Sequence, residues 1–323
     1  MSSRFAGVVI VRFVCALAAV VALAQCAPAL PREHGATTGT PESKQAPVVD
    51  TPETKQWRAQ LGGPIEPFRI VGNIYYVGAT NIASYLIATS RGLILLDAGT
   101  REMGPRIQAS IVKLGFRVKD VKIMLTSHAH WDHVEGDAAM KRATGAQVMA
   151  LEEEAPALTS GGARLAIPDD LGWEPIAVDR VLHDGDDVVL GDVTMHAVLT
   201  AGHTQGCTTW TTTANDHGRR YEVALVCIPM AAAGVKLLGN PRYPNMAEDL
   251  ARSIQVLKQL KPDIFLDGHP EEFYADKLAR LRAGESPSPL LDHGGFAKYL
   301  AEAEADLQRR LNEERAGRTP SPR

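Results

Sequence analysis

Hydrophobic positions along the chain switch between the spacing of strands and the spacing of helices. From residue 57 to residue 285, short apolar runs bounded by turn-forming residues alternate with segments whose apolar residues recur at helical intervals. Strands are predicted at residues 74–77, 84–88, 93–96, 121–125, 181–190, 193–199, 208–212, 221–228 and 264–266. Helices are predicted at residues 105–114, 134–144, 247–260 and 296–316. Because strands follow one another as well as helices, the pattern predicts an α/β sandwich rather than a doubly wound sheet.

The first 24 residues have the layout of a secretory signal peptide. Arg4 and Arg12 precede an apolar run at residues 13–24, which ends in small residues typical of a cleavage site. This run is shorter than the roughly 20 residues that a membrane-spanning helix needs. The sequence therefore predicts an exported, periplasmic protein with no stable membrane span in the mature chain. An alternative is cleavage before Cys26 with lipid attachment there, since residues 23–26 resemble a bacterial lipoprotein signal.

The remaining residues divide into a linker, one domain and a tail. Residues 25–56 are rich in Pro and Thr and lack apolar periodicity, which predicts a solvated linker. Residues 57–316 are predicted to form one domain because no second such stretch divides them. Residues 317–323 read as a flexible tail.

Composition and charge narrow the function classes. The 323 residues include 34 Lys and Arg against 38 Asp and Glu, so the net charge of −4 disfavours nucleic acid as a partner. With 45% hydrophobic residues, wholesale disorder is excluded. The four cysteines are too few for a disulfide-built scaffold, although one bridge remains open. No protein partner is implied.

A dense cluster of metal-binding residue types follows the predicted strand at 121–125. His128, His130, Asp132 and His133 occupy six consecutive positions in the segment LTSHAHWDHVEGD. His128 and His130 project to the same side of an extended backbone, and imidazole with carboxylate is a donor set typical of zinc. The alternative is a polar loop that happens to hold three histidines.

Two further histidines have a similar setting. His203 follows the predicted strand at 193–199 in a glycine-bounded turn, and His269 follows the strand at 264–266. Either histidine alone is a weak signal, but the upstream cluster needs partners to complete its coordination. We therefore expect both to join the metal site.

The ordered set LLDAG (95–99), SHAHWDH (127–133), GHT (202–204) and GH (268–269) resembles the metallo-β-lactamase superfamily. More narrowly, GNIYYVG, GHTQGCTTW, GNPRYP and the closing helix look like class B metallo-β-lactamases of subclass 3. The resemblance covers nearly the whole domain. It implies an αβ/βα sandwich, the metallo-β-lactamase fold, with the metal site at the sheet edge.

The resemblance also implies a ligand set of two Zn²⁺ per chain. His128, His130 and His203 would hold the first ion, and Asp132, His133 and His269 the second. Asp97 would orient a ligand histidine, unless it is only a turn residue before Gly99.

The implied function is a secreted zinc-dependent hydrolase that opens the β-lactam ring of antibiotics by attack of a zinc-bound hydroxide. Asp132 would be catalytic, positioning the nucleophile. One alternative is another hydrolase of this fold, acting on lactones or thioesters; a second is a non-catalytic zinc-binding protein. Lactone and thioester hydrolases of the superfamily carry an Asp after the strand that ends here in VALVCIPM. Its absence from residues 227–230 favours the β-lactamase branch.

The chain departs from subclass 3 around its expected substrate cleft. Ile228 and Met230 stand where members often have serines, and Gln205 replaces a usual proline. Trp57 and Trp131 are weak candidates for cleft walls, with packing as the alternative. Lys236 or Arg242 could seat a substrate carboxylate instead of the missing serines, with ordinary surface charges as the alternative. Separately, Cys207 and Cys227 are expected to form a disulfide in an oxidising compartment, with two buried free thiols as the alternative.

Overall fold

The computed structural model describes residues 51–165, 171–270, 274–285 and 288–318. The predicted signal peptide, the alternative lipid site at Cys26, most of the predicted linker and the end of the tail lie outside these residues. The described residues all belong to one compact unit. Among the described helices, none combines the length and the apolarity needed to cross a bilayer.

Two mixed sheets make up the domain. The first has seven strands in sequential order, β1 to β7, antiparallel up to β4 and parallel from β4 to β7. The second has five strands in the order β12-β11-β10-β9-β8, antiparallel except for the pair β11 and β12. Their bounds are β1 Phe68–Val71, β2 Ile74–Tyr76, β3 Tyr85–Thr89, β4 Gly92–Leu96, β5 Val121–Leu125, β6 Gln147–Leu151, β7 Arg180–Leu182, β8 Asp187–Leu190, β9 Val193–Leu199, β10 Thr208–Asp216, β11 Arg219–Val226 and β12 Ile264–Asp267.

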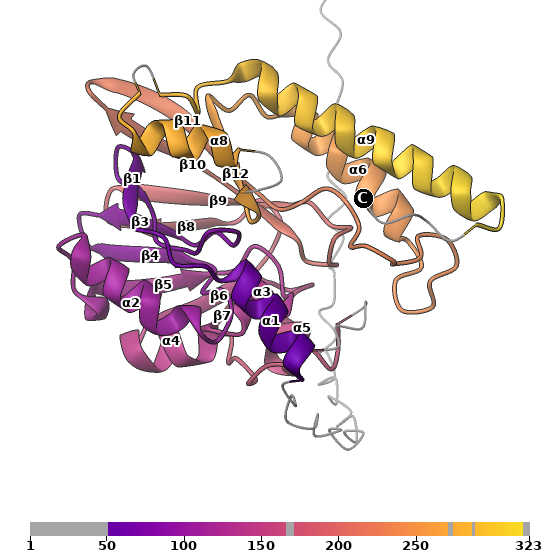
Figure 1. Ribbon diagram of the computed structural model, residues 1–323, viewed down its shortest axis with the longest axis horizontal. Helices are drawn as coiled ribbons and strands as arrows, with labels where there is room; N and C mark the ends of the chain where they lie inside the picture. The colour runs from indigo at the N-terminus through magenta and orange to yellow at the C-terminus, as the bar shows by residue number, and fades with distance from the viewer. Residues whose placement is uncertain (1–50, 166–170, 271–273, 286–287, 319–323) are drawn as a thin grey trace, which may run out of the picture. The chain divides into compact units, whose positions relative to one another are not determined.

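Helices cover the outer face of each sheet (Figure 1). Helices α2 (Met103–Lys113) and α4 (Asp137–Thr144) pack on the first sheet, and α6 (Met246–Gln259) and α9 (His293–Arg315) on the second. The alternation of strand residues creates these layers: Ile94 and Leu96 face the core between the sheets, whereas Leu95 packs against helices. Shorter elements complete the domain: α1 Pro52–Leu61, η1 Val118–Asp120, α3 Trp131–Val134, α5 Ala155–Thr159 and α8 Ala275–Arg282. The predicted αβ/βα sandwich is confirmed.

Strand direction brings several loops to one edge of each sheet. In the first sheet β4, β5 and β6 are parallel and in close register, with Leu96 opposite Leu125 and Leu125 opposite Met149. In the second sheet β9 and β11 are both antiparallel to β10, and β12 is parallel to β11. The loops that follow these six strands therefore leave from the carboxyl edges, which is where candidate residues are predicted.

Some predicted boundaries were wrong. The run at residues 181–190 is two strands in different sheets, β7 and β8, because Gly185 makes a turn at φ 84° between them. The helix predicted at 134–144 is α3 followed by α4, interrupted next to Gly136. A side chain at Gly136 would lie 2.5 Å from the carbonyl oxygen of Ala98. Helix α1 begins at Pro52, inside the predicted linker, because the Thr51 side chain caps it by accepting a hydrogen bond from the Thr54 N–H at 3.2 Å.

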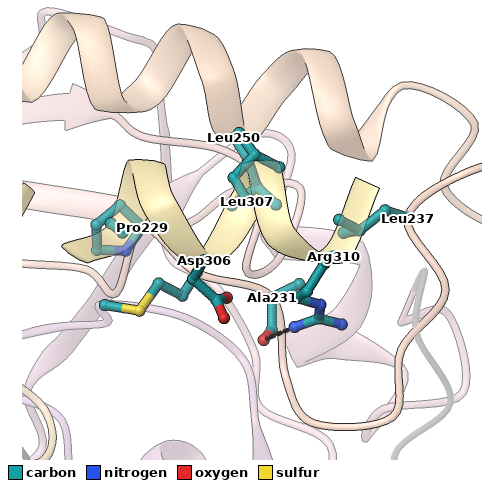
Figure 2. Close-up of a pocket in the computed structure, with 9 residues that line it drawn as sticks. Pro229, Ala231, Leu237, Leu250, Asp306, Leu307 and Arg310 are labelled. Atoms are coloured by element: carbon teal, nitrogen blue, oxygen red, sulfur yellow. Dashed lines mark hydrogen bonds between the residues drawn. The ribbon is translucent and has the colours of Figure 1, made fainter. Parts of the chain in front are cut away.

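Helix α9 holds the loop that follows β11. The Arg310 guanidinium donates to the carbonyls of Ala231 and Val235 at 2.6 Å each, and Figure 2 shows the first of these bonds. One turn later, the Glu314 carboxylate accepts hydrogen bonds from the N–H groups of Leu237 and Leu238 at 2.7 Å each. The loop is therefore held to helix α9 by the guanidinium of Arg310 and the carboxylate of Glu314.

Candidate metal centre

His128, His130 and His203 lie together although their loops come from different sheets. The loop after β5 supplies His128 and His130, and the loop after β9 supplies His203. Ring centroids are 4.6 Å apart for His128 and His203, 4.6 Å for His130 and His203, and 4.8 Å for His128 and His130. One nitrogen from each ring lies within 4.8 Å of the others.

Asp132, His133 and His269 form a second group beside the first. His133 Nε2 lies 3.1 Å from His269 Nε2, and Asp132 Oδ2 lies 3.6 Å and 3.5 Å from these two nitrogens. The two groups adjoin, since the ring centroids of His128 and His133 are 4.1 Å apart. Helix α3 supplies Asp132 and His133, and the loop after β12 supplies His269.

The geometry of both groups fits a metal cofactor. Two ligand atoms at about 2.1 Å from a tetrahedral zinc ion lie roughly 3.4 Å apart, close to the separations in the second group. Within the described residues, the buried Nε2 of His128 has no hydrogen-bond partner. A lone pair that is buried without a donor is costly unless a ligand takes it.

The three histidines of the first group are also in the neutral state that metals bind. Burial lowers the pKa of His128 and His203 well below its usual value, and neighbouring histidines lower it further. Burial likewise lowers the pKa of His130 to about 4. For Asp132, burial raises the pKa, but His133 and His269 outweigh it and the net shift is downward. At neutral pH the first group therefore presents three neutral imidazoles, and Asp132 in the second group is an ionised carboxylate.

Asp97, in the turn after β4, contacts the neighbours of both groups. Its Oδ1 accepts the Ser127 N–H at 2.7 Å, and its Oδ2 accepts the Ser127 hydroxyl at 2.6 Å. That serine oxygen lies 3.1 Å from His128 Nδ1, while Asp97 Oδ2 lies 3.2 Å from His133 Nδ1. Because a carboxylate only accepts, His133 Nδ1 carries the proton, and its Nε2 faces the second group, 3.1 Å from His269 Nε2.

Backbone features position His203 and His269. His203 Nδ1 donates to the carbonyl of Met230 at 2.6 Å, which leaves its Nε2 as the free nitrogen. His269 follows Gly268, where a Cβ would lie 2.5 Å from Cε1 of His133. Glycine is therefore required for the β12 loop to approach His133 this closely.

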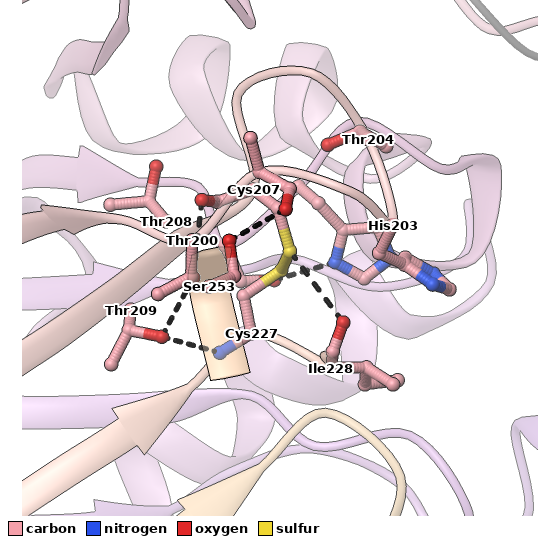
Figure 3. Close-up of a disulfide and its surroundings, with 12 residues drawn as sticks. Thr200, His203, Thr204, Cys207, Thr208, Thr209, Cys227, Ile228 and Ser253 are labelled. Atoms are coloured by element: carbon pink, nitrogen blue, oxygen red, sulfur yellow. Dashed lines mark hydrogen bonds between the residues drawn. A yellow bond between two sulfur atoms is a disulfide. The ribbon is translucent and has the colours of Figure 1, made fainter. Parts of the chain in front are cut away.

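The Cys207–Cys227 disulfide is present, so the free-thiol alternative does not hold (Figure 3). The two Cα atoms are 5.8 Å apart, and both cysteines are buried. Cys207 lies four residues after His203, and Cys227 lies at the start of the loop whose Met230 carbonyl accepts from His203. The bridge closes a loop with a sequence separation of 20, worth roughly 3 kcal/mol in the chain-entropy model.

The cleft candidates differ in exposure. Trp57 is 48% exposed, and its ring centroid lies 4.8 Å from that of Trp131, which is buried. Ile228 and Met230 are buried in the cluster formed with α6 and α9. Of these four residues, Trp57 alone offers a large exposed apolar surface.

Sequence reasoning missed Ser127 and Glu154. Ser127 directly precedes His128, and this position could have marked it as part of the site. A serine in a loop is, however, too common to indicate a functional role. Glu154 is buried and follows β6, a strand that the apolar pattern did not identify. With β6 placed beside β5, an acidic residue after its end would have been a candidate.

Known proteins resemble the chain over most of this domain. Residues 77–216 match the family model described as the metallo-beta-lactamase superfamily. The native FEZ-1 metallo-beta-lactamase from Legionella gormanii has 40% sequence identity over 79% of this chain and 98% of its own, with a TM-score of 0.76. BJP-1, a subclass B3 metallo-beta-lactamase of Bradyrhizobium japonicum, has 37% identity over 80% and 99%, with a TM-score of 0.75.

The chain also has a shorter match, to curated proteins that are named for a different hydrolase activity. A hydroxyacylglutathione hydrolase of Rhizobium johnstonii is 30% identical over 105 residues, which span 32% of this chain and only 33% of that protein. The structural matches cover nearly all of each relative at higher identity, so they carry more weight. The chain therefore belongs to the metallo-beta-lactamase superfamily, and the solved structures that it resembles include subclass B3 enzymes.

Proposed function

We propose that this chain is an exported, zinc-dependent β-lactamase that opens the ring of β-lactam antibiotics. The observation that carries the proposal is the convergence of six metal-binding side chains into two adjoining groups, in a chain whose structural relatives are named metallo-beta-lactamases. The disulfide supports export, since such bonds persist in oxidising compartments.

Two zinc ions fit these groups. His128, His130 and His203 would hold one ion, and Asp132, His133 and His269 the other. Three protein ligands per ion, with imidazole predominant, are typical of catalytic zinc rather than of closed structural zinc or of iron. When bound, zinc supplies Lewis acidity that polarises an amide carbonyl and makes hydroxide available near neutral pH.

The chain's own residues prepare this chemistry. Asp132 is ionised and 14% exposed, so it can position an attacking water and hold the proton that the water loses. Asp97 and the Met230 carbonyl fix the ring orientations of His133 and His203. Trp57 can contact the apolar part of a substrate at the rim.

A second candidate is thioester hydrolysis, because the curated relatives are named hydroxyacylglutathione hydrolases. Thioester hydrolases of the superfamily are expected to carry an Asp after the strand that corresponds to β11. Here residues 227–230 are Cys, Ile, Pro and Met, which contain no carboxylate. The missing carboxylate favours a β-lactam over a thioester as the substrate.

The test is a substrate panel with the purified chain. Nitrocefin, a carbapenem, a lactone and a hydroxyacylglutathione thioester are each assayed before chelation, after chelation and after zinc is restored. We expect β-lactam hydrolysis that chelation abolishes and zinc restores. Turnover of the thioester or lactone alone would support the second candidate, and zinc binding without any turnover would support a storage or sensing role.

A further inference from the structure

Glu154 is a buried carboxylate that touches both loops of the first histidine group. It follows β6, is 2% exposed and lies just before α5. Its Oε1 accepts a short hydrogen bond from the Ala129 N–H. Its Oε2 accepts the Thr204 hydroxyl at 2.9 Å and the Gly206 N–H at 2.7 Å.

These three donors flank the three histidines. Ala129 lies between His128 and His130, and Thr204 directly follows His203. The two oxygens of one side chain thus join a loop of the first sheet to a loop of the second. Another direct link between these segments is the bond from the Thr208 N–H to the Ser127 carbonyl at 2.7 Å.

The contact is tight and depends on a glycine. A Cβ at Gly206 would lie 2.4 Å from the backbone nitrogen of Glu154 and 2.6 Å from its Oε2. The His203 loop therefore rests directly on Glu154. Among the described residues, no Lys or Arg forms an ion pair with this carboxylate, so loop amides and a hydroxyl are what satisfy it.

A carboxylate buried without a cation is costly, but an apolar residue in its place would leave the Ala129, Thr204 and Gly206 donors without an acceptor. What a carboxylate adds is two acceptor oxygens, one for each loop. We propose that Glu154 is a positioning residue that sets the spacing between the His128–His130 loop and the His203 loop, and thereby the zinc affinity of that group. This inference rests on the proposed zinc-dependent function.

Glu154→Gln tests the idea with little change in size. A glutamine has one acceptor oxygen, so its amide N–H₂ must face either the Ala129 N–H or the Thr204 and Gly206 donors. Thr204→Val is a milder variant that removes one of the three bonds. Glu152→Gln is the matched control, because Glu152 is in the same turn but its side chain is 56% exposed.

Zinc binding and thermal unfolding are measured on the full chain. Each metal-stripped protein is titrated with zinc against a chromophoric chelator and melted with and without zinc. We expect Glu154→Gln to weaken one of two zinc sites about tenfold or more, the range found for groups that support metal ligands, and to reduce the stabilisation by zinc. Thr204→Val should show a smaller loss, and Glu152→Gln none.

The outcomes separate this inference from the proposed function. If wild type binds two zinc ions and both Glu154→Gln and Thr204→Val bind them equally well, Glu154 is only structural and the inference is overturned. A purely structural role would lower the melting temperature equally with and without zinc. If Glu154→Gln does not fold, Thr204→Val decides. If wild type itself binds no zinc, the proposed function fails.

Discussion

The carboxylate of Asp97 lies 3.2 Å from Nδ1 of His133, and the same carboxylate binds Ser127, whose hydroxyl reaches His128. One acidic side chain thus orients a histidine in each group. Its backbone is in the left-handed region at φ 58°, a conformation in which Asp is tolerated better than most residues. The turn is held in place because Ala98 N–H and Gly99 N–H both donate to the His133 carbonyl, at 3.1 Å and 2.9 Å.

Asp97→Asn should reduce zinc affinity and activity by about 10- to 100-fold, the range for groups that orient metal ligands. The amide replaces one acceptor oxygen with a donor, so it cannot accept from the Ser127 N–H, the Ser127 hydroxyl and His133 together. Zinc titration and β-lactam turnover measure the effect. Asp276→Asn, at an exposed position in α8, is the control and should resemble wild type. Equal zinc affinity in Asp97→Asn and wild type would contradict the role given to Asp97.

His130→Ala and Asp132→Ala should each leave a folded chain whose activity falls on the order of 10³-fold or more, equivalent to about 4 kcal/mol of transition-state stabilisation. Each variant removes one of three side chains in its group. Circular dichroism checks the fold, and turnover under excess zinc checks the activity. His196→Ala, a half-exposed histidine on β9, should retain activity. Near-normal turnover in His130→Ala or Asp132→Ala would show that the substituted residue is not needed for activity.

Gly268→Ala should impair the second group through a steric clash. The added Cβ would lie 2.5 Å from Cε1 of His133, so the ring or the β12 loop must shift, at a cost of about 1–3 kcal/mol. Urea unfolding and zinc titration measure the two effects. Gly104→Ala is the control, because its Cβ would meet nothing closer than 3.9 Å and alanine favours a helix. Unchanged zinc binding in Gly268→Ala would show that this close approach is not required.

Arg310→Met should raise KM more than it lowers kcat. The substitution leaves the carbonyls of Ala231 and Val235 without their donor, which loosens the loop beside Met230 and costs about 1.5–3 kcal/mol of stability. Steady-state kinetics and thermal unfolding report the two quantities. Glu302→Gln, half-exposed on the same helix, should change neither. A variant as stable as wild type with the same KM would mean that α9 does not restrain this loop.

Acid should destabilise the metal-free chain through His130. Its pKa is about 4 when folded and near 6.5 when unfolded, so the unfolded state binds more protons between these values and stability falls as pH decreases. This single group lowers stability by about 2 kcal/mol from pH 7.5 to pH 5. Other groups titrate too, and burial raises the pKa of Glu154 to about 7, which acts in the opposite direction.

The measurement is therefore a difference between two metal-free proteins. Urea unfolding of wild type and His130→Gln in chelator at both pH values isolates the contribution of this histidine. Relative to wild type, the variant should gain about 2 kcal/mol on acidification. A constant difference between the two proteins would show that His130 titrates normally in the folded chain.

The sequence predicted the layered fold because strand residues alternate and turn residues bound the runs. Strands β5 and β9 begin and end where predicted, since each is a short apolar run between polar turns. The run at residues 181–190 was wrongly predicted to be one strand, because its apolar ends hide the turn at Asp184, Gly185 and Asp186 that separates β7 from β8. Strand β6 was missed, and so was the short helix α5 that follows it.

The six metal-binding candidates were predictable because each follows a strand's end by at most eight residues and has a distinctive side chain. Their grouping, however, came from the family resemblance. Glu154 was not predictable, since its contacts depend on which loops the fold brings to it. The hydrogen bond between Met230 and His203 was not predictable either, because it uses the backbone carbonyl of Met230 and not its side chain.

Elemental analysis of zinc in the purified full chain shows whether the six side chains bind two metal ions. After exposure to zinc and removal of the unbound metal, we expect two zinc ions per chain in wild type and fewer in the His130→Ala and Asp132→Ala variants. A wild-type chain that retains no zinc would contradict this expectation.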